Sequence, residues 1–239
     1  MNTIMIGNSE YSILLSEYLE DEGVHVDAYA VEEKYIKESS IGNIQVISLK
    51  EMFERYEPDN TRLFMGIGYK LRGAIRRKLF EKCLEKGFHF SNYIHPSAKI
   101  DRSIQLGEGN IIFENVVIQK HVKVGNCNLF FSNAVVMHDD TIGNYNTCCA
   151  CSVMNGFVKM EDNVFLRFNA TIRDHVKIET GTIIGAGVYV NRNSEKDMAV
   201  IGRSPTEIMG GVQDYRKNYR IEYLWYGAPK YNHSLCRLY

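Results

Sequence analysis

The segment His138-Asp139-Asp140 places an imidazole directly before two carboxylates in the middle of the chain. An unperturbed imidazole has a pKa of about 6.5, so a neutral histidine can accept a proton from an attacking amine or hydroxyl. A neighbouring carboxylate can orient such a ring and raise its basicity. The alternative is a surface histidine beside solvated acids, and composition alone favours it. The choice between them depends on where the fold places His138.

A six-residue repeat dominates the second half of the chain. Stepping by six from Ile94 meets an apolar residue at seventeen consecutive positions, without an insertion that shifts the phase. Because apolar residues make up 45% of the chain, chance agreement would be roughly one in a million. The repeated positions are Ile94, Ile100, Leu106, Ile112, Ile118, Val124, Phe130, Val136, Ile142, Cys148, Met154, Met160, Leu166, Ile172, Ile178, Ile184 and Val190. The position four residues after each is mostly small or β-branched.

This period fits neither an α-helix nor a flat strand, and it predicts a left-handed parallel β-helix over residues 94–205. Each hexad then forms one face and one corner, and about eighteen residues complete a coil. Gly107, Gly125, Gly143 and Gly185 directly follow inward positions, where we expect the corner to need backbone freedom. His138 follows inward Val136 by two residues, which predicts a corner position outside the core. Because the interior of such a prism is packed, a site must lie on its outer faces or between copies.

Residues 1–93 alternate strand and helix patterns, which predicts an α/β, Rossmann-like domain with a parallel sheet. The expected strands are Thr3–Gly7, Val24–Ala30, Arg62–Ile67 and Phe88–Tyr93. One helix is expected around Leu14–Leu19, and two more are expected at Leu49–Tyr56 and Lys70–Lys86. The basic stretch in the last helix is expected to form a solvated face, with an anion site as the lesser alternative.

Ligands of parallel α/β sheets bind at the carboxyl ends of the strands. These ends correspond here to Gly7–Tyr11, Val31–Glu33 and Gly66–Tyr69. The first turn lacks G-x-G-x-x-G, so a dinucleotide site is not indicated. Glu32 or Glu33 could accept hydrogen bonds from a base or sugar, Gly68 would allow close backbone approach, and the following helix N-terminus could hold phosphate. Plain turn glycines and surface acids are an equal alternative.

Composition excludes several classes of protein. A net charge of −1 gives no electrostatic case for nucleic acid or an anionic membrane surface. The chain has no apolar stretch near the ~18 residues of a membrane span and does not begin with a secretory pattern, which indicates a cytoplasmic protein. The six cysteines are then most simply small buried hydrophobes.

Metal binding is not expected. Cys149-x-Cys151 is too close for usual zinc-finger spacing and lacks a second pair. His121, His138 and His175 are 17 and 37 residues apart, unlike the close histidine pair of the prisms that bind zinc between subunits. His175, beside Asp174, is a secondary candidate base. His121 has no evident partner in the sequence, and His95 marks the entry to the prism.

The combination resembles a known family, the bacterial sugar acyltransferases that include sialic-acid O-acetyltransferases and UDP-linked amino-sugar N-acetyltransferases. The features that carry the resemblance are the Rossmann-like unit, the entry Ile94-His95-Pro96-Ser97-Ala98, the continuous hexads and the His-acid pair, up to about Pro205. The resemblance implies a cytoplasmic homotrimer that transfers an acetyl group from acetyl-CoA to a nucleotide-linked sugar in surface polysaccharide biosynthesis. No metal takes part, and the corner histidine is the base.

The resemblance also implies roles for individual residues. His138 would be the base and Asp139 the acid that tunes it, within the segment Ser132–Asp139. Acetyl-CoA would contact Thr147, Phe168 and Ala186, and the nucleotide-sugar would contact Ser9, Glu10, Tyr11, Glu32 and Gly68. The chain departs from the family pattern at Ser9-Glu10-Tyr11, Phe131, Thr147 and the exit Gly202-Arg203-Ser204-Pro205.

Two alternatives stay open beside acetyl transfer. One is a trimeric, non-catalytic binding or scaffold module. The other is transfer of a longer acyl group, which depends on groove width near Phe130, Phe131 and Phe168. The choice between a nitrogen and an oxygen acceptor is also open. A C-terminal extension, 206–239, with the single tryptophan Trp225, is expected to cap the prism or to form a subunit contact.

Overall fold

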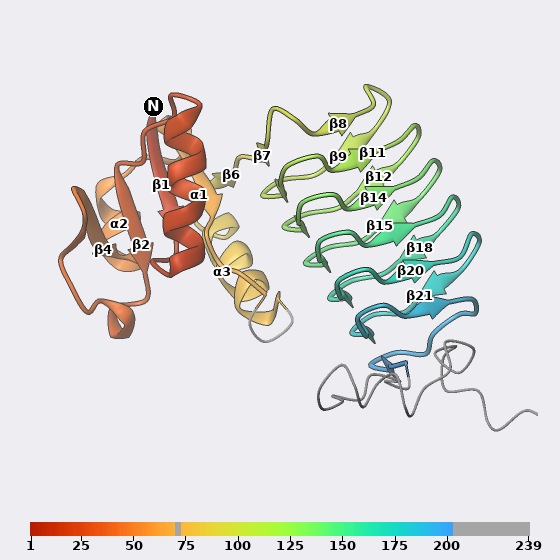
Figure 1. Cartoon of the computed structure of the whole chain (residues 1–239). Coiled ribbons are helices and arrows are strands. Elements are labelled where there is room, and N and C mark those ends of the chain that lie inside the picture. The colour runs from red at the N-terminus through yellow and green to blue at the C-terminus, as the bar shows by residue number, and fades with distance from the viewer. Residues whose placement is uncertain (70–72, 203–239) are drawn as a thin grey trace, which may run out of the picture. The chain divides into compact units, whose positions relative to one another are not determined.

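The computed structural model describes residues 1–69 and 73–202 (Figure 1). The predicted extension 206–239 and Cys236 lie outside the described residues. Residues 1–200 form one compact unit. Near the predicted boundary at residue 93, the last strand of the N-terminal sheet, β6 (His89–Phe90), is followed by the first strand of the prism, β7 (Tyr93–Ile94).

The N-terminal part is an α/β unit whose strands run in the order β3-β4-β2-β1-β5-β6. All neighbours are parallel except β3 and β4. The strands are β1 (Asn2–Ile6), β2 (Ala28–Val31), β3 (Ser40–Ile41), β4 (Ile44–Ser48), β5 (Thr61–Met65) and β6, and the helices are α1 (Glu10–Asp21), α2 (Leu49–Arg55) and α3 (Ala74–Leu84), with short 3-10 turns at Glu33–Tyr35 and Pro58–Asn60. The predicted Rossmann-like unit is confirmed. The β3–β4 hairpin was not predicted; β3 has only two residues, whereas β4 has five, of which Val46 and Ile47 are buried.

Both faces of this sheet are covered, which explains why the central strand β1 ends in three consecutive apolar residues, Ile4, Met5 and Ile6. Met5 shares a buried cluster with Leu15 and Leu19 of α1. Ile4 lies on the opposite face, in a cluster with Met52 of α2 and Leu79 of α3. The helices therefore pack on opposite faces, and the carboxyl ends of β2, β1 and β5 meet at one edge of the sheet.

The second part is the predicted left-handed parallel β-helix, made of three sheets of two-residue strands (Figure 1). Strands eighteen residues apart pair in parallel, as Ile111 does with Leu129. The first sheet contains β7, β10 (Ile111–Ile112), β13 (Leu129–Phe130), β16 (Thr147–Cys148), β19 (Phe165–Leu166), β22 (Ile183–Ile184) and β24 (Ala199–Val200). The second contains β8 (Lys99–Ile100), β11 (Val117–Ile118), β14 (Val135–Val136), β17 (Val153–Met154), β20 (Thr171–Ile172) and β23 (Tyr189–Val190). The third contains β9 (Gln105–Leu106), β12 (Lys123–Val124), β15 (Thr141–Ile142), β18 (Lys159–Met160) and β21 (Lys177–Ile178).

The six-residue phase correctly identifies the core of the prism. Every repeat position from Ile112 to Val190 is buried. Ile94, at the open first coil, is 39% exposed because no earlier coil covers it. The position four residues later is also directed into the core, since Val116, Val122 and Val158 belong to the same buried cluster.

The corners use left-handed backbone, but not at the glycines expected to supply it. Positive φ recurs three residues after each inward position from Leu106 to Ile184, mostly at non-glycine residues such as Asn133 and Asp139. Gly125 has no positive φ, and a Cβ there would lie 2.5 Å from Asn144 Oδ1 and 2.7 Å from the Gly143 carbonyl oxygen. Glycine after the inward residue therefore allows close approach of the next coil rather than a turn, and the expectation of corner freedom was wrong.

A ladder of buried asparagines runs along one corner. In Asn128 the side-chain oxygen accepts the backbone N–H of Asn146 at 2.8 Å, and the amide donates to Asn110 Oδ1 and the Gly143 carbonyl at 3.0 Å each. Asn110 accepts from the Asn128 N–H in the same way at 2.9 Å. Each asparagine therefore satisfies a buried backbone donor of the next coil.

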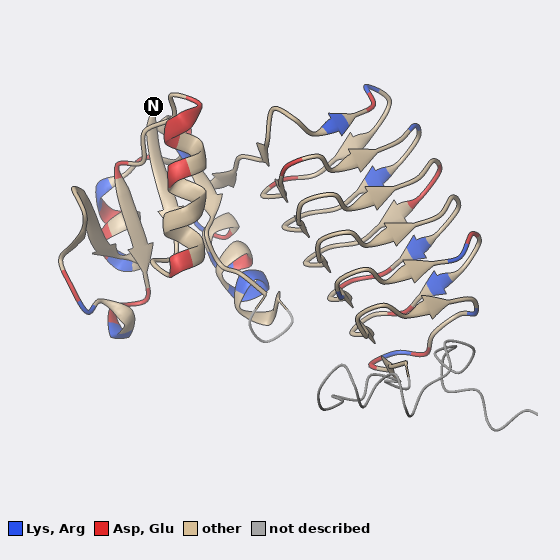
Figure 2. Cartoon of the chain, viewed as in Figure 1, with Lys and Arg blue, Asp and Glu red and all other residues tan. Residues whose placement is uncertain are grey.

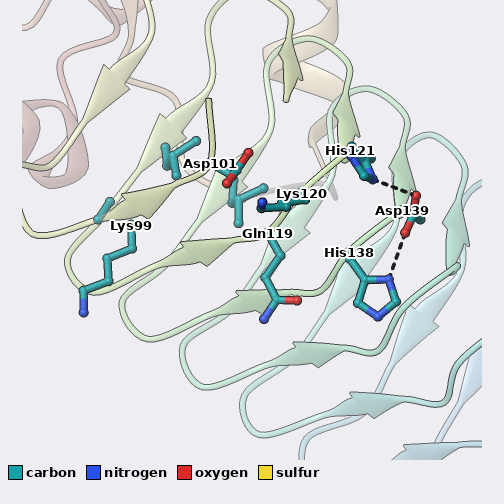
Figure 3. Close-up of a pocket in the computed structure, with 10 residues that line it drawn as sticks. Lys99, Asp101, Gln119, Lys120, His121, His138 and Asp139 are labelled. Atoms are coloured by element: carbon teal, nitrogen blue, oxygen red, sulfur yellow. Dashed lines mark hydrogen bonds and ion pairs between the residues drawn. The ribbon is translucent and has the colours of Figure 1, made fainter. Parts of the chain in front are cut away.

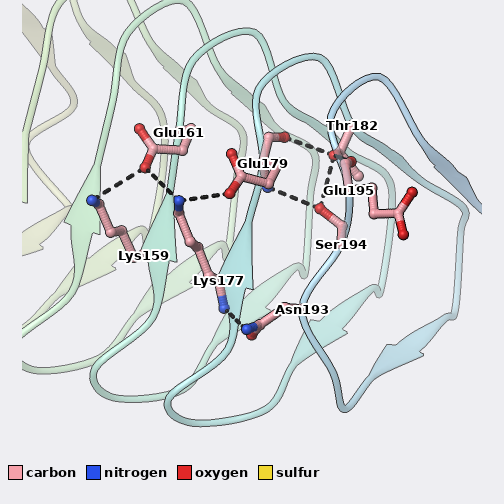
Figure 4. A network of polar contacts seen from close by, with 8 residues as sticks. All are labelled: Lys159, Glu161, Lys177, Glu179, Thr182, Asn193, Ser194 and Glu195. Carbon is pink, nitrogen blue, oxygen red and sulfur yellow. Dashed lines mark hydrogen bonds and ion pairs between the residues drawn. The ribbon is translucent and has the colours of Figure 1, made fainter.

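One outer face carries lysines on three of its strands, Lys123 on β12, Lys159 on β18 and Lys177 on β21, among the blue arrows of Figure 2. Thr141 of β15 lies between Lys123 and Lys159. Lys159 and Lys177 pair directly across the ladder. Glu161 lies between them, 3.2 Å from Lys159 and 3.6 Å from Lys177 (Figure 4). These exposed ion pairs contribute little to stability, but they offset the repulsion between stacked lysines.

The repeat phase breaks after Val190, as predicted, yet the coil continues. Ile183 pairs with Ala199 of β24, a spacing of sixteen residues instead of eighteen. The shortened coil is held by Asn193, which accepts the Lys177 N–H at 2.8 Å, and by Ser194, which accepts the Glu179 N–H at 2.8 Å (Figure 4). The predicted polar loop at 191–198 is thus an ordered turn of the prism.

The asparagine ladder yields a stability prediction. Asn128→Val fits the corner column, which holds Val164 two coils later, but it leaves the Asn146 N–H and the Gly143 carbonyl without their partner. We expect a loss of about 2–4 kcal/mol of unfolding free energy, since each buried orphan costs about 1–3 kcal/mol. Denaturant unfolding measures it. Asn2→Ala, which removes one exposed bond of 3.4 Å, is the control. Equal stability of the two variants would contradict the ladder's role.

Candidate active site

The corner after β14 places His138 on the outside of the prism, as predicted. Its ring Nδ1 lies 2.9 Å from Asp139 Oδ2, and 47% of the His138 side chain is exposed. Asp139 adopts the left-handed conformation that closes the corner, with a φ of 61°. This backbone turn brings the carboxylate beside the preceding imidazole. The other ring nitrogen, Nε2, stays available to a proton from solution or from a bound molecule.

A second histidine binds the same carboxylate from the previous coil. His121 Nδ1 lies 3.2 Å from Asp139 Oδ1 (Figure 3). The two residues are eighteen apart in sequence, one full coil. The hydrogen bond from His138, followed by that from His121, lowers the pKa of Asp139. Asp139 is therefore ionised near neutral pH, and the interpretation of His121 as a histidine without a partner was wrong.

The next coil forms the other wall around His138. A Cβ on Gly156 would lie 2.8 Å from His138 Cε1, so only a glycine leaves room for the ring there. The Phe157 ring meets His138 edge-on at 5.2 Å and stacks on His175 at 4.8 Å. His175 lies 3.9 Å from Asp174 and belongs to this stack. The imidazole of His138 is thus confined between neighbouring coils while its outer edge stays exposed.

An open groove of about 850 Å³ begins at His138 and Asp139 and extends over the two preceding coils (Figure 3). Its charged lining includes Lys99, Asp101 and Lys120. The remaining lining residues are Ala98, Ile100, Ile118, Gln119 and His121. The candidate base therefore faces a surface large enough for a small molecule.

Asp140, the third residue of the motif, is fully buried and is not one of the solvated acids that the sequence suggested. Burial raises the pKa of Asp140 to about 8. The charge of Asp139 also raises this pKa, whereas the hydrogen bond from the Val158 N–H lowers it. Two adjacent carboxyl groups thus have opposite environments. Asp139 carries the charge, and Asp140 is held in its neutral form near pH 7.

None of the three residues predicted to contact acetyl-CoA lies at the corner of His138: Thr147 belongs to strand β16, and Phe168 and Ala186 lie at the corner after the first sheet. Phe168 is 47% exposed, and Ala186, one coil further, is exposed. Thr147 is only 1% exposed, and its hydroxyl accepts a hydrogen bond from Arg76 at 2.9 Å. Thr147 therefore presents no free surface to a cofactor. Phe168 and Ala186 are exposed, and their contact with acetyl-CoA stays a prediction.

Arg76 is the one basic side chain of α3 that departs from the expected solvated face. It is fully buried and donates to the carbonyls of Gly68 at 3.0 Å, Tyr145 at 2.8 Å and Asn146 at 3.1 Å. Burial lowers the pKa of its guanidinium. The side chain fastens the segment after β5 to a corner of the prism. A contact between distant segments gives no periodic signal, so the sequence did not reveal it.

The residues predicted to bind the nucleotide-sugar gather at the carboxyl edge of the sheet. Ser9 and Glu10 are exposed at the start of α1. Glu32 follows β2, and Lys78 at 2.7 Å lowers its pKa. The Tyr11 ring meets Phe113 of the prism edge-on at 6.1 Å, and burial raises the pKa of its hydroxyl. A Cβ at Gly68 would find ordinary contacts of 3.7 Å, so close backbone packing does not require glycine there.

Within the described residues, no group of three metal-binding side chains lies close enough to hold an ion, and no helix is long and apolar enough to cross a membrane. Cys83, Cys127, Cys148 and Cys149 are buried thiols, as expected, whereas Cys151 is exposed.

The shared carboxylate predicts a titration effect. His121→Ala removes one of the two hydrogen bonds to Asp139, so the pKa of Asp139 should rise toward its usual value. His138→Ala should raise it further, because His138 makes the larger contribution. Carboxyl ¹³C shifts followed over pH report both changes, and Glu32, whose pKa is lowered mainly by Lys78, serves as an internal reference. An Asp139 pKa that His121→Ala leaves unchanged would contradict the pairing.

Comparison with known proteins places these features in context. A family model described as bacterial transferase hexapeptide (six repeats) matches residues 157–192. A comparison with curated proteins finds no match. The acetyltransferase domain of PglB from Neisseria gonorrhoeae, solved with acetyl coenzyme A, has the same fold at 18% identity, with a TM-score of 0.72 and coverage of 83% of this chain and 94% of that chain.

Higher identity is found with proteins of Caulobacter crescentus. PerB, solved in complex with CoA and GDP-perosamine, is 27% identical, with a TM-score of 0.72 and coverage of 88% of this chain and 98% of that chain. A histidine-to-alanine variant of GDP-perosamine N-acetyltransferase, with the same two ligands, is 28% identical, with a TM-score of 0.76 and the same coverage. The chain thus has bacterial-transferase hexapeptide repeats over residues 157–192 and is similar in its two-part architecture to these acetyltransferases.

Proposed function

We propose that the protein transfers an acetyl group from acetyl-CoA to an amine or hydroxyl of a nucleotide-linked sugar, with His138 as the general base. The observation that carries this proposal is the exposed His138–Asp139 pair, at 2.9 Å, facing an open groove. The likeness to PerB, which was solved with CoA and GDP-perosamine at 27% identity, supports the choice of donor and acceptor class. Surface polysaccharide biosynthesis is the use that the sequence resemblance suggests.

The chemistry needs one positioned base. As the acceptor nitrogen or oxygen attacks the thioester carbonyl, its proton passes to Nε2 of His138. The C–S bond then breaks, CoA leaves as a thiolate, and it takes up the proton that the imidazole gained. Asp139 holds the Nδ1–H and stabilises the imidazolium formed on the way. His121, on the other oxygen of Asp139, keeps that carboxylate directed at His138.

A single chain does not bring all the predicted groups together. His138 lies at the corner after the second sheet, whereas Phe168 and Ala186 lie at the corner after the first. We propose that the protein is a homotrimer in which the cofactor groove forms between neighbouring copies. The nucleotide-sugar would be held at the carboxyl edge of the N-terminal sheet by Ser9, Glu10 and Glu32.

A thiol-release assay with acetyl-CoA tests the proposed activity against a panel of nucleotide-linked amino-sugars. His138→Ala should lower kcat by roughly 10²–10⁴-fold, the usual contribution of a general base, while acetyl-CoA still binds. A non-catalytic scaffold would show no CoA-dependent turnover in the unaltered protein. Activity on a free or polymer-bound sugar alone would overturn the nucleotide-linked acceptor, and preference for longer acyl-CoA would overturn the acetyl group.

The space at Gly156 gives a second kinetic prediction. In Gly156→Ala the new methyl group would meet the imidazole at about 3 Å, so the ring must shift. We expect kcat to fall by about 10- to 100-fold, because small misplacements of a catalytic group are costly. The KM for acetyl-CoA should change little. Asn2→Ala, which removes only one exposed hydrogen bond of 3.4 Å, is the control, and equal kcat in both variants would count against a confined base.

A further inference from the structure

Asp140 occupies a position that is apolar in the two coils before it and the two coils after it. Residues at the same corner, eighteen apart, are Ile104, Val122, Val158 and Val176. Only the coil that carries His138 has a carboxyl group in this column, and the side chain is fully buried. Burying a carboxyl group is unfavourable unless it is neutral or hydrogen-bonded. Its presence at this one coil therefore calls for a structural or functional reason.

The hydrogen bond of Asp140 connects two successive corners. Its Oδ1 accepts the backbone N–H of Val158 at 2.7 Å. Val158 ends the turn of residues 155–158, which contains Gly156 and Phe157. Both residues lie beside the His138 ring: a Cβ added at Gly156 would come within 2.8 Å of it, and the centroid of the Phe157 ring lies 5.2 Å from its centroid. The Phe157 N–H also donates to the His138 carbonyl at 3.2 Å.

We propose that Asp140 is a positioning residue that, through Val158, fixes the turn of residues 155–158 against the imidazole of His138. The inference rests on the proposed role of His138 as the base. The asparagine ladder uses the same device at another corner, where Asn128 accepts the Asn146 N–H at 2.8 Å. This hydrogen bond requires a side chain as long as aspartate with an oxygen acceptor at its end, and asparagine also supplies one.

The charge of Asp140 takes no part in this role. Asp139 is the adjacent charged group and is bound by His138 and His121. Asp140 Oδ2 is buried and has no hydrogen-bond partner within the described part of the chain. A neutral carboxyl group therefore fits the site better than a carboxylate. Asp140→Asn should keep the bond to Val158, whereas Asp140→Val, the residue of the neighbouring coils, should lose it.

The kinetic test compares these two variants in the thiol-release assay. Asp140→Val should lower kcat by about 10- to 100-fold without a matching change in the KM for acetyl-CoA, and Asp140→Asn should stay within about threefold of the unaltered protein. Adding Asp140→Val to His138→Ala should cause no further loss of kcat. Asn110→Val, which removes the equivalent bond to Asn128 at another corner, should lower the Tm with little change in kcat. Full activity of Asp140→Val, or equal losses in the Val and Asn variants, would overturn the proposal.

A thermal measurement tests the buried carboxyl group without any turnover. Its pKa is raised from 3.8 in the unfolded chain to about 8 in the folded one, so folding becomes less favourable as the pH rises through this window. The Tm of Asp140→Asn relative to the unaltered protein should therefore increase from about pH 4 to pH 8. A difference that does not vary with pH would overturn the buried position of Asp140. If the pH trend appears but no substrate is turned over, the proposed function fails and the geometry stands.

Discussion

The backbone ladder between coils is the constraint on which the rest of this structure depends. Each strand residue pairs in register with the residue eighteen positions away, from Tyr93 to Val190. Because the register does not slip, residues eighteen apart stack into columns that run along the prism. A side chain in such a column has its closest neighbours in the preceding and following coils rather than in its own sequence segment. The chemistry of a corner is therefore decided by three coils at once.

Two such columns build the candidate site. One column contains Lys120, His138 and Gly156. Lys120, which lines the groove, lies one coil before the base, and Gly156, which leaves room for the imidazole ring, lies one coil after it. The next contains His121, Asp139 and Phe157, which provide a donor to the carboxylate, the carboxylate itself and an aromatic wall. The imidazole is thus held by a charge on one side and by a close steric fit on the other. Substitutions one coil away from His138 are expected to act on the same rate as substitutions beside it.

The sequence predicts much of this arrangement because the period is visible in it. The hexads identify the inward positions and place His138 at a corner, and the same period, applied to outward residues, relates His121 to Asp139. That relation was missed because histidines were compared by their mutual spacing and not with acids one coil away. Asp140 was misread for a different reason. Its position four residues after an inward residue predicts burial, but its acidic neighbour suggested a solvated pair.

Other features have no periodic signal and could not be predicted in this way. Arg76 lies on a helix of the N-terminal part, and its partners are carbonyl groups near residue 145, whose availability depends on how the two segments pack. Its role is nevertheless physical and specific. A guanidinium buried without a carboxylate is stable only if several carbonyls replace water, and Gly68, Tyr145 and Asn146 do so. The same side chain thereby connects the segment after β5, where the sugar nucleotide is proposed to bind, with the prism that carries the base. The position of the segment after β5 thus depends on its contacts with the prism, and the position of His138 likewise depends on the coils on either side of it.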